Sequence, residues 1–326
     1  MSLDTIFTVY YAFYFIFSIS AQLFVLFLII FHSPSNLKDM KKLMMATSTS
    51  QIIMCLSAFL TQVRIVPIDS SIALLSFGSC TLLGHQACLA TYNMLNTSGC
   101  LVVASLLHMM FYRRRLLTTL KKFSNGQFFF NCVIVYFLSA IVLIFSFLGP
   151  TDFEFIRALV ITNYPYIDLN SYTLSGFSNV KHFFCSTATG IIAAHAYIPP
   201  FVALIWRGKI VSEINSQRLS LSSRTQLQTR NFVKCLTFQT CLPLFFYVLP
   251  YTFYLIQQIF GIGFTITEYL IFPLNTFSAV LDPIFMLYFI KPYQRKAKII
   301  ISEMFGLSNL GNSSTVATVN SNTSQV

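Results

Sequence analysis

Charged side chains are scarce in this chain of 326 residues, where Asp, Glu, Lys and Arg together make up 10%. A typical soluble domain has roughly a quarter. The hydrophobic fraction is 55%, and phenylalanine alone contributes 35 residues. So few polar side chains could not cover the surface of a soluble domain of this length. The composition therefore excludes a soluble protein and predicts a chain whose solvent is the lipid bilayer.

Lysine and arginine are absent from residues 1–31, so the basic segment that begins a cleavable signal peptide is missing. The apolar run from Phe7 to Phe31 is also too long for the apolar core of such a peptide. We expect this run to stay in the mature protein as the first membrane span.

Long apolar runs are the main feature of the chain. A helix needs about 20 apolar residues to cross the hydrocarbon, and inside lipid it satisfies its own backbone hydrogen bonds. The alternation of short strands that a β-barrel requires is absent. The sequence therefore predicts an all-α, polytopic membrane protein with a seven-transmembrane-helix bundle over residues 7–290. The predicted spans are 7–31, 43–62, 86–111, 128–148, 183–206, 232–260 and 265–290.

The basic residues predict the orientation of this bundle. Of the 21 Lys and Arg, 18 fall on one side, beside the ends of spans one, three, five and seven. The other three are Arg64, Arg157 and Lys181. Basic residues concentrate on the cytoplasmic side of membrane proteins, which places the N-terminus (1–6) outside and the C-terminus inside. Because the net charge of +11 lies in short clusters between apolar runs, it does not indicate a nucleic-acid partner.

Two segments lie outside the spans. Residues 149–182 form a long outer segment, for which a lid over the bundle and a mobile surface loop are equally consistent. After Pro292, apolar side chains share one helical face, which predicts a short amphipathic helix over 291–307 on the cytoplasmic leaflet. Residues 308–326 contain Ser, Thr and Asn without aromatics, so we expect a disordered tail.

Three of the eight cysteines, Cys80, Cys88 and Cys185, lie near the outer side. That side is oxidising, so one disulfide is expected there. The pair Cys80–Cys185 is favoured, and Cys88–Cys185 is the alternative. Either bond would clamp the outer segment over the mouth of the bundle.

Asp282 lies deep in the seventh span, where a carboxylate costs about 2.5–3.5 kcal/mol on insertion scales. We expect it to face the bundle interior, with partners in the polar run Thr47–Gln51 of span two. A conformational switch and a static polar network are both open for it. Prolines at 199, 200, 243 and 250 are expected to kink spans five and six.

A small-molecule site needs an apolar cavity with a few convergent polar groups. The outer halves of the spans supply such groups, although each of them could instead form only interhelical hydrogen bonds. The candidate ligand-binding residues are Tyr92, Asn93, Asn96, His195, Tyr251, Tyr254, Glu268 and Tyr269.

Several short segments together resemble one family. They include LDPIFMLYF (281–289) followed by KPY (291–293), IVP (65–67), ALLSFGSC (73–80), and TFQ (237–239) with LPLFF (242–246). The chain resembles nematode chemosensory serpentine receptors, class delta, from about residue 7 to 305. The resemblance implies a plasma-membrane G-protein-coupled receptor in the sensory cilia of chemosensory neurons. Its expected partners are a small or volatile ligand and a heterotrimeric G protein.

The chain departs from rhodopsin-like receptors at two motifs. The acidic-arginine pair at the end of span three is replaced by FYR (111–113), so only the arginine carries over. In span seven Asp282 replaces the usual asparagine, and Tyr288 follows Pro283 by five residues. The predicted conformational switch comprises Asp282, Pro283, Tyr288, Pro243 and Pro250. The predicted G-protein-coupling residues, which also serve as topology anchors, are Tyr112, Arg113, Arg114, Arg115 and Lys234.

Two other functions compete with that of a receptor. A transporter or ligand-gated channel remains the alternative, although seven spans do not divide into two equal repeats. An enzyme is not expected, because metalloprotease and serine-hydrolase motifs and a pair of intramembrane aspartates are all missing. We expect no cofactor and no metal.

Overall fold

The computed structural model describes residues 3–33, 40–119, 124–216, 223–260 and 265–304. Within these ranges, seven helices are long and apolar enough to cross a membrane, as the apolar runs predict. Six are continuous α-helices. The remaining one is broken by a π-helical turn, Leu244–Val248. The spanning helices are α1 (Leu3–His32), α2 (Lys41–Thr61), α3 (His85–Thr119), α4 (Asn125–Leu148), α6 (Phe183–Ser216), α7 (Ser223–Pro243) with α8 (Leu249–Phe260), and α9 (Thr265–Phe289).

The bundle presents large apolar side chains to its surroundings. Phe13 on α1 and Phe129 on α4 are 71% and 70% exposed. In water such side chains would be a liability, but in hydrocarbon they are matched to the solvent. Polar side chains such as Gln22, Ser48 and Asp282 are buried between the helices instead.

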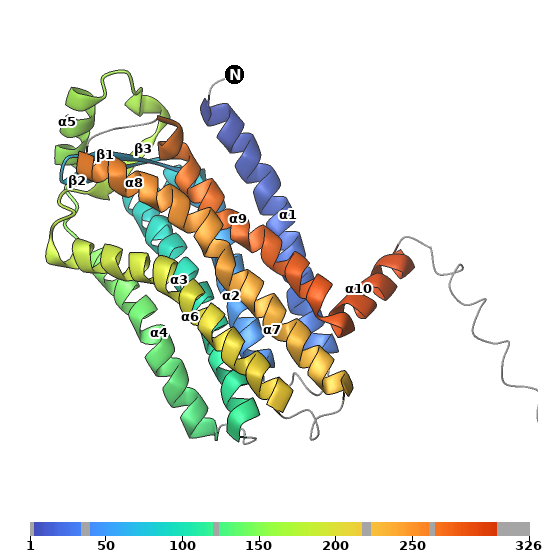
Figure 1. Ribbon diagram of the computed structural model, residues 1–326. Helices are drawn as coiled ribbons and strands as arrows, with labels where there is room; N and C mark the ends of the chain where they lie inside the picture. The colour runs from blue at the N-terminus through green and yellow to red at the C-terminus, as the bar shows by residue number, and fades with distance from the viewer. Residues whose placement is uncertain (1–2, 34–39, 120–123, 217–222, 261–264, 305–326) are drawn as a thin grey trace, which may run out of the picture.

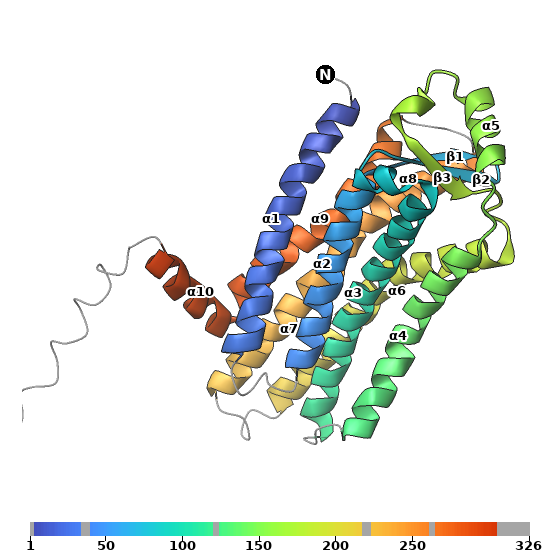
Figure 2. The same cartoon turned by 180° about the vertical axis from the view of Figure 1, so that it is seen from behind.

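A three-stranded antiparallel sheet covers the end of the bundle that carries the N-terminus (Figures 1 and 2). The strands are β1 (Val63–Ile68), β2 (Ser71–Ser76) and β3 (Thr173–Phe177). Val63, Ile65 and Leu74 pack on the bundle. The alternate residues pack against α5 (Phe153–Asn163). This end is called the sheet end below.

Gly176 is required where β3 joins β2. Its φ is +147°, and a Cβ there would lie 2.1 Å from the carbonyl oxygen of Ile72. Because β3 belongs to the long segment between α4 and α6, this pairing fixes that segment over the bundle. The segment is therefore a folded cap of sheet and helix, which favours the lid interpretation over a mobile loop.

At the opposite end, α10 (Lys291–Met304) leaves the bundle at an angle to α9 (Figures 1 and 2). Tyr293 and Ala297 face the bundle and are buried, while Lys298 and Ile299 on its other faces are exposed. The hydroxyl groups of Tyr293 and Ser33 lie 2.8 Å apart, which ties α10 to the end of α1. The disordered tail predicted at 308–326 lies outside the described residues.

Candidate functional site: a capped polar network above an internal cavity

A buried ion pair joins β1, an edge strand of the sheet, to α9. Arg64 of β1 donates from Nε to Glu268 Oε2 at 2.8 Å, and its Nη2 lies 2.7 Å from the same oxygen. The two side chains are 6% and 3% exposed. Burial lowers the pKa of Arg64, but Glu268 together with Tyr269 and Tyr172 raises that pKa by more, so the net shift is upward. Arg64 therefore stays charged and paired.

Two tyrosines and Asp4 extend this pair to the N-terminal helix. Arg64 Nη1 donates to the Tyr269 hydroxyl at 2.9 Å, and that hydroxyl donates to Asp4 Oδ1 at 2.8 Å. The Tyr172 hydroxyl donates to the same Asp4 oxygen at 2.7 Å. Burial raises the pKa of Tyr172, and so does its bond to Asp4. The network joins α1, β1, α9 and the segment before β3 into one unit.

Glu268 and Tyr269, both predicted to bind ligand, thus belong to this sheet-end network. Nothing in the sequence pairs Arg64 with a residue 204 positions away. The only unusual feature of Arg64 in the sequence is that it is one of three basic residues on the predicted outer side.

An internal cavity lies deeper, among α2, α3, α6, α7 and α9, and has a volume of about 40 Å³. Two predicted ligand residues, Asn96 and His195, line it. Asp282 lines it as well, so the cavity joins the predicted ligand region to the predicted switch. The sequence missed Tyr247 and Ser278 of the lining, because neither residue type is distinctive in a helix.

Asp282 is buried, and the side chains of Gln51 of α2 and Gln239 of α7 are polar neighbours that stabilise its charged form. Gln51 belongs to the Thr47–Gln51 run in which its partners were expected. Three helices therefore meet at one carboxylate on the wall of the cavity.

The π-helical turn begins directly after Pro243 and ends just before Pro250. A proline removes one backbone hydrogen bond from a helix, and π-helical turns accommodate such breaks, often at functional sites. Tyr247 projects from this turn to the cavity wall. The predicted bend in this helix thus lies beside the cavity.

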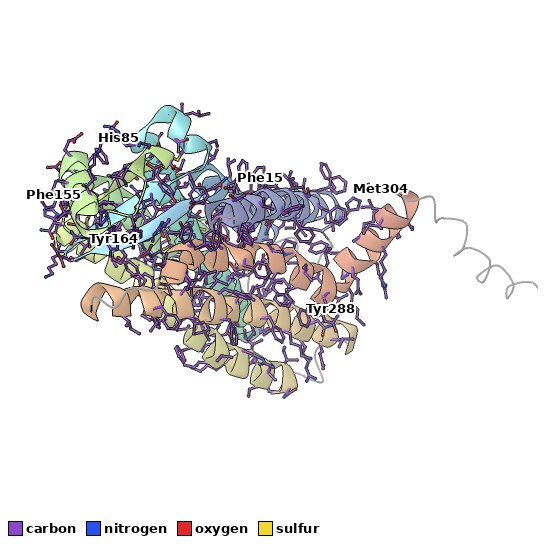
Figure 3. All side chains as sticks on the ribbon, turned by 90° about the horizontal axis from the view of Figure 1, so that it is seen from above. Phe15, His85, Phe155, Tyr164, Tyr288 and Met304 are labelled. Atoms are coloured by element: carbon purple, nitrogen blue, oxygen red, sulfur yellow. A yellow bond between two sulfur atoms is a disulfide. The ribbon has the colours of Figure 1, made fainter. Side chains whose placement is uncertain are left out.

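The remaining predicted residues do not line the cavity. Tyr92 packs edge-on against Phe272 with centroids 5.6 Å apart, and Tyr251 contacts Tyr254 at 5.8 Å. The Asn93 side chain is fully buried, and neither of its amide atoms has a partner among the described residues. Tyr288 is 68% exposed and lies near α10 rather than with Asp282 (Figure 3).

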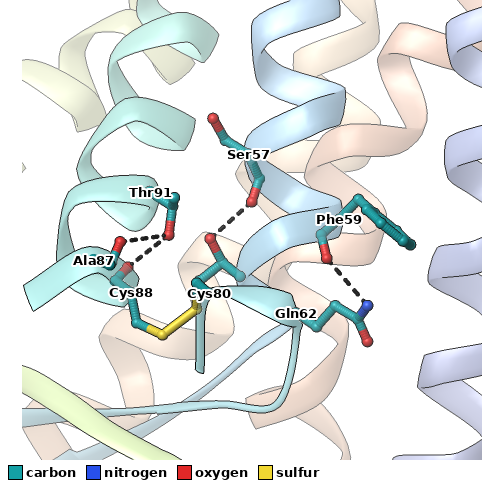
Figure 4. Close-up of a disulfide and its surroundings, with 8 residues drawn as sticks. Ser57, Phe59, Gln62, Cys80, Ala87, Cys88 and Thr91 are labelled. Carbon is teal, nitrogen blue, oxygen red and sulfur yellow. Dashed lines mark hydrogen bonds between the residues drawn. A yellow bond between two sulfur atoms is a disulfide. The ribbon is translucent and has the colours of Figure 1, made fainter. Parts of the chain in front are cut away.

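The predicted disulfide is wrong. Cys80 is bonded to Cys88 (Figure 4), and Cys185 is free and buried. A 3-10 turn over Ser79–Leu83, followed by Gly84 with φ +89°, reverses the chain before α3 and brings the two Cα atoms to 5.1 Å. Cys185 instead packs against Gly149, where a Cβ would lie 2.6 Å from its sulfur.

At the α10 end of α3, Arg113 is 7% exposed. Its Nη2 donates to the Thr229 hydroxyl of α7, so the two helices are joined there. Tyr112 is buried beside it, Arg114 and Arg115 are half-buried, and Lys234 is exposed. Four of the five predicted coupling residues are therefore partly or fully covered.

Comparisons with known proteins decide the family. The family model described as serpentine-type 7TM GPCR chemoreceptor Srd matches residues 7–299. The chain belongs to the Srd chemoreceptor family. Serpentine receptor class delta-50 of Caenorhabditis elegans is 30% identical, with 91% of each chain covered. Class delta-51 from the same organism is 29% identical over 90% of this chain and 86% of that one.

The fold agrees with that membership. The Srd receptor aligns with the crystal structure of squid rhodopsin at a TM-score of 0.63, covering 94% of this chain and 87% of that one. The sequence identity is 11%, so this likeness concerns the fold alone. The chain is a multi-pass membrane receptor with the seven-helix fold of G-protein-coupled receptors, and it is not an enzyme.

Proposed function

We propose that this Srd receptor detects a small uncharged molecule in the internal cavity and signals to a heterotrimeric G protein at the α10 end. The sheet end would face outward, at the plasma membrane of sensory cilia, because 18 of the 21 basic residues then lie inside. The supporting observation is that one cavity is lined by Asn96, His195 and Asp282. Its lining is mainly apolar, so a charged ligand would lose its hydration without compensation.

The cavity is small in this structure. A volume of about 40 Å³ holds roughly three water molecules, whereas small-molecule sites span about 300–1,000 Å³. A ligand therefore has to displace the wall. The π-helical turn at Tyr247 is the part of the wall with a weakened backbone, and a shift there would move α7.

Movement of α7 would reach the G-protein end directly. Arg113 is joined to Thr229 of α7, so an outward shift of α7 would release the arginine. Arg114, Arg115 and Lys234 would then line a basic opening for the G protein. Asp282 would act as the hinge contact, since it interacts with side chains of both α2 and α7.

A matched glycine pair tests the site. Gly99 lines the cavity, and a Cβ there meets only Met54 Sδ at 3.9 Å, whereas Gly190 on α6 is exposed with nothing within 4 Å. Receptor-expressing cells with cAMP and calcium reporters are screened with volatile and water-soluble metabolites. Gly99→Leu should abolish a ligand response at normal surface level, and Gly190→Leu should retain it.

Two outcomes would contradict the proposal. A response that survives in Gly99→Leu would place the ligand elsewhere. A ligand-evoked current that persists when G proteins are blocked would indicate a channel, the alternative that the sequence left open.

A further inference from the structure

A groove opens on the side of the bundle between α3, α4 and α6, with a volume of about 450 Å³. In Figures 1 and 2, α4 and α6 meet near the sheet end and diverge toward the other end. The volume lies within the range of about 300–1,000 Å³ that holds small molecules. It is some ten times that of the internal cavity. We call it the α3–α4–α6 groove.

The groove faces the hydrocarbon of the bilayer. Its rim includes Ile134 and Leu138 of α4, which are 55% and 46% exposed, and Ile198 of α6, which is 57% exposed. All three lie within membrane-spanning helices. A molecule entering here arrives through the lipid, so it must be largely apolar and uncharged.

One polar side chain on the groove wall is buried without a hydrogen bond. His108 of α3 is 1% exposed, and both ring nitrogens lack a partner within the described parts of the chain. Buried polar groups are nearly always hydrogen-bonded, because an unpaired one costs its lost hydration. The other polar side chains of the wall are satisfied differently. Asn131 donates to Gln127 O at 2.7 Å, and His195 Nδ1 lies 2.9 Å from Ile191 O.

The His108 ring is held in place by two aromatic rings of α4. Its centroid lies 5.9 Å from that of Phe128 in a stacked arrangement and 6.1 Å from that of Tyr136 in an edge-on one. The Tyr136 hydroxyl itself accepts from Ser105 at 3.2 Å. A neutral imidazole offers one donor and one acceptor, so His108 is a fixed hydrogen-bonding point in an apolar groove.

We infer that the α3–α4–α6 groove binds an uncharged, lipid-soluble alcohol, whose hydroxyl group pairs with a ring nitrogen of His108. A hydroxyl both donates and accepts, so it satisfies the imidazole in either tautomer. The apolar body of the molecule would fill the groove beside Leu138 and Ile198. This site shares only His195 with the lining of the internal cavity, and it does not depend on the ligand or G-protein coupling proposed above.

The receptor contains its own reporter for this site. Trp206 is the only tryptophan in the chain, and it lines the groove. A bromine atom near an indole ring quenches its fluorescence. Purified full-length receptor in phosphatidylcholine vesicles is titrated with 11-bromo-1-undecanol and, separately, with 1-bromoundecane, which lacks the hydroxyl group.

The expected result is saturable quenching of Trp206, with the bromo-alcohol binding roughly 2- to 10-fold more tightly than the bromoalkane. His108→Phe keeps the stacking on Phe128 and removes both nitrogens, so the preference should disappear. The matched control His85→Phe alters a histidine at the sheet end, beside Phe153, and should keep the preference.

A second variant guards against misfolding of His108→Phe. Ala194 lines the groove, and Ala194→Leu should weaken saturable quenching by both probes. Cholesterol added to the vesicles identifies the source of the ligand. Competition with the bromo-alcohol would indicate a bilayer sterol, and its absence would indicate a linear alcohol. Equal affinity for the two probes in the wild-type receptor, or an unchanged preference in folded His108→Phe, would overturn the inference.

Discussion

The two ends of the receptor each bury an arginine, but they satisfy it differently. Arg64 at the sheet end is 5% exposed and bonds to a carboxylate and a tyrosine hydroxyl. Arg113 at the α10 end is 7% exposed and bonds to the Thr229 hydroxyl, while its Nε has no partner in the described part of the chain. A buried charge without a counter-charge is costly. We therefore expect the sheet end to be rigid and the contact at the α10 end to break more readily.

Removing the counter-charge at the fixed end should have the largest effect. Glu268→Ala leaves Arg64 buried and uncompensated, and we expect a loss of about 3–5 kcal/mol of stability, measured by denaturation of the purified receptor. Glu154 is an exposed acid at the same end, and Glu154→Ala should change stability by about 0.5 kcal/mol or less.

The double variant Arg64→Met with Glu268→Leu sharpens that test. Removing both charges should recover most of the loss, because a buried ion pair adds little net stability over apolar side chains of similar size. Equal damage from the double and single variants would mean that the tyrosine and Asp4 contacts, rather than the charge, hold this end together.

Reduction or loss of the Cys80–Cys88 bond should have a smaller effect, because it closes a loop of only eight residues. We expect Cys80→Ser to cost about 2–3 kcal/mol, and Cys185→Ser to leave the disulfide intact. Non-reducing peptide mapping would check both. A cross-linked peptide containing Cys185 in the wild-type receptor would restore the pairing predicted from the sequence.

Gly176 tests whether the sheet itself holds the cap. Gly176→Ala places a Cβ 2.1 Å from Ile72 O at a positive φ, and we expect a loss of about 1–3 kcal/mol. Gly126→Ala is the matched control, because nothing lies within 4 Å of its Cβ position. Thermal unfolding of the two variants would separate them, and equal melting temperatures would contradict the role of β3.

The fold could largely be predicted from the sequence, because long phenylalanine-rich runs specify spanning helices by composition alone. The sheet could not. Residues 63–68 and 71–76 are buried on both faces, so they lack the polar alternation that marks a half-exposed strand. The hairpin also depends on Asp69 adopting a positive φ of 47°, which no motif in the segment indicates.

Within the site, the depth of each polar side chain in the membrane could be predicted from the sequence, but its interaction partner could not. The sequence predicts that Asp282 contacts the Thr47–Gln51 run, and Gln51 does interact with it. Glu268 was assigned to ligand, because its partner Arg64 lies far away in the sequence. The disulfide prediction is wrong for a different reason, because Cys80 meets Cys88 through a local turn that cysteine spacing alone does not reveal.

The smallest chemical change tests the central claim, that the α10 end is held closed by the contact between Arg113 and Thr229. Thr229→Val removes that hydroxyl and keeps the size of the side chain. Thr237→Val is the matched control on α7, because the Thr237 hydroxyl donates only to its own helix, at Val233 O. Ligand-independent nucleotide exchange would be measured in membranes supplied with a panel of G proteins. The account predicts a rise of roughly 3- to 10-fold for Thr229→Val and no change for Thr237→Val. Equal basal exchange in both variants and the wild-type receptor, at equal surface level, would contradict it.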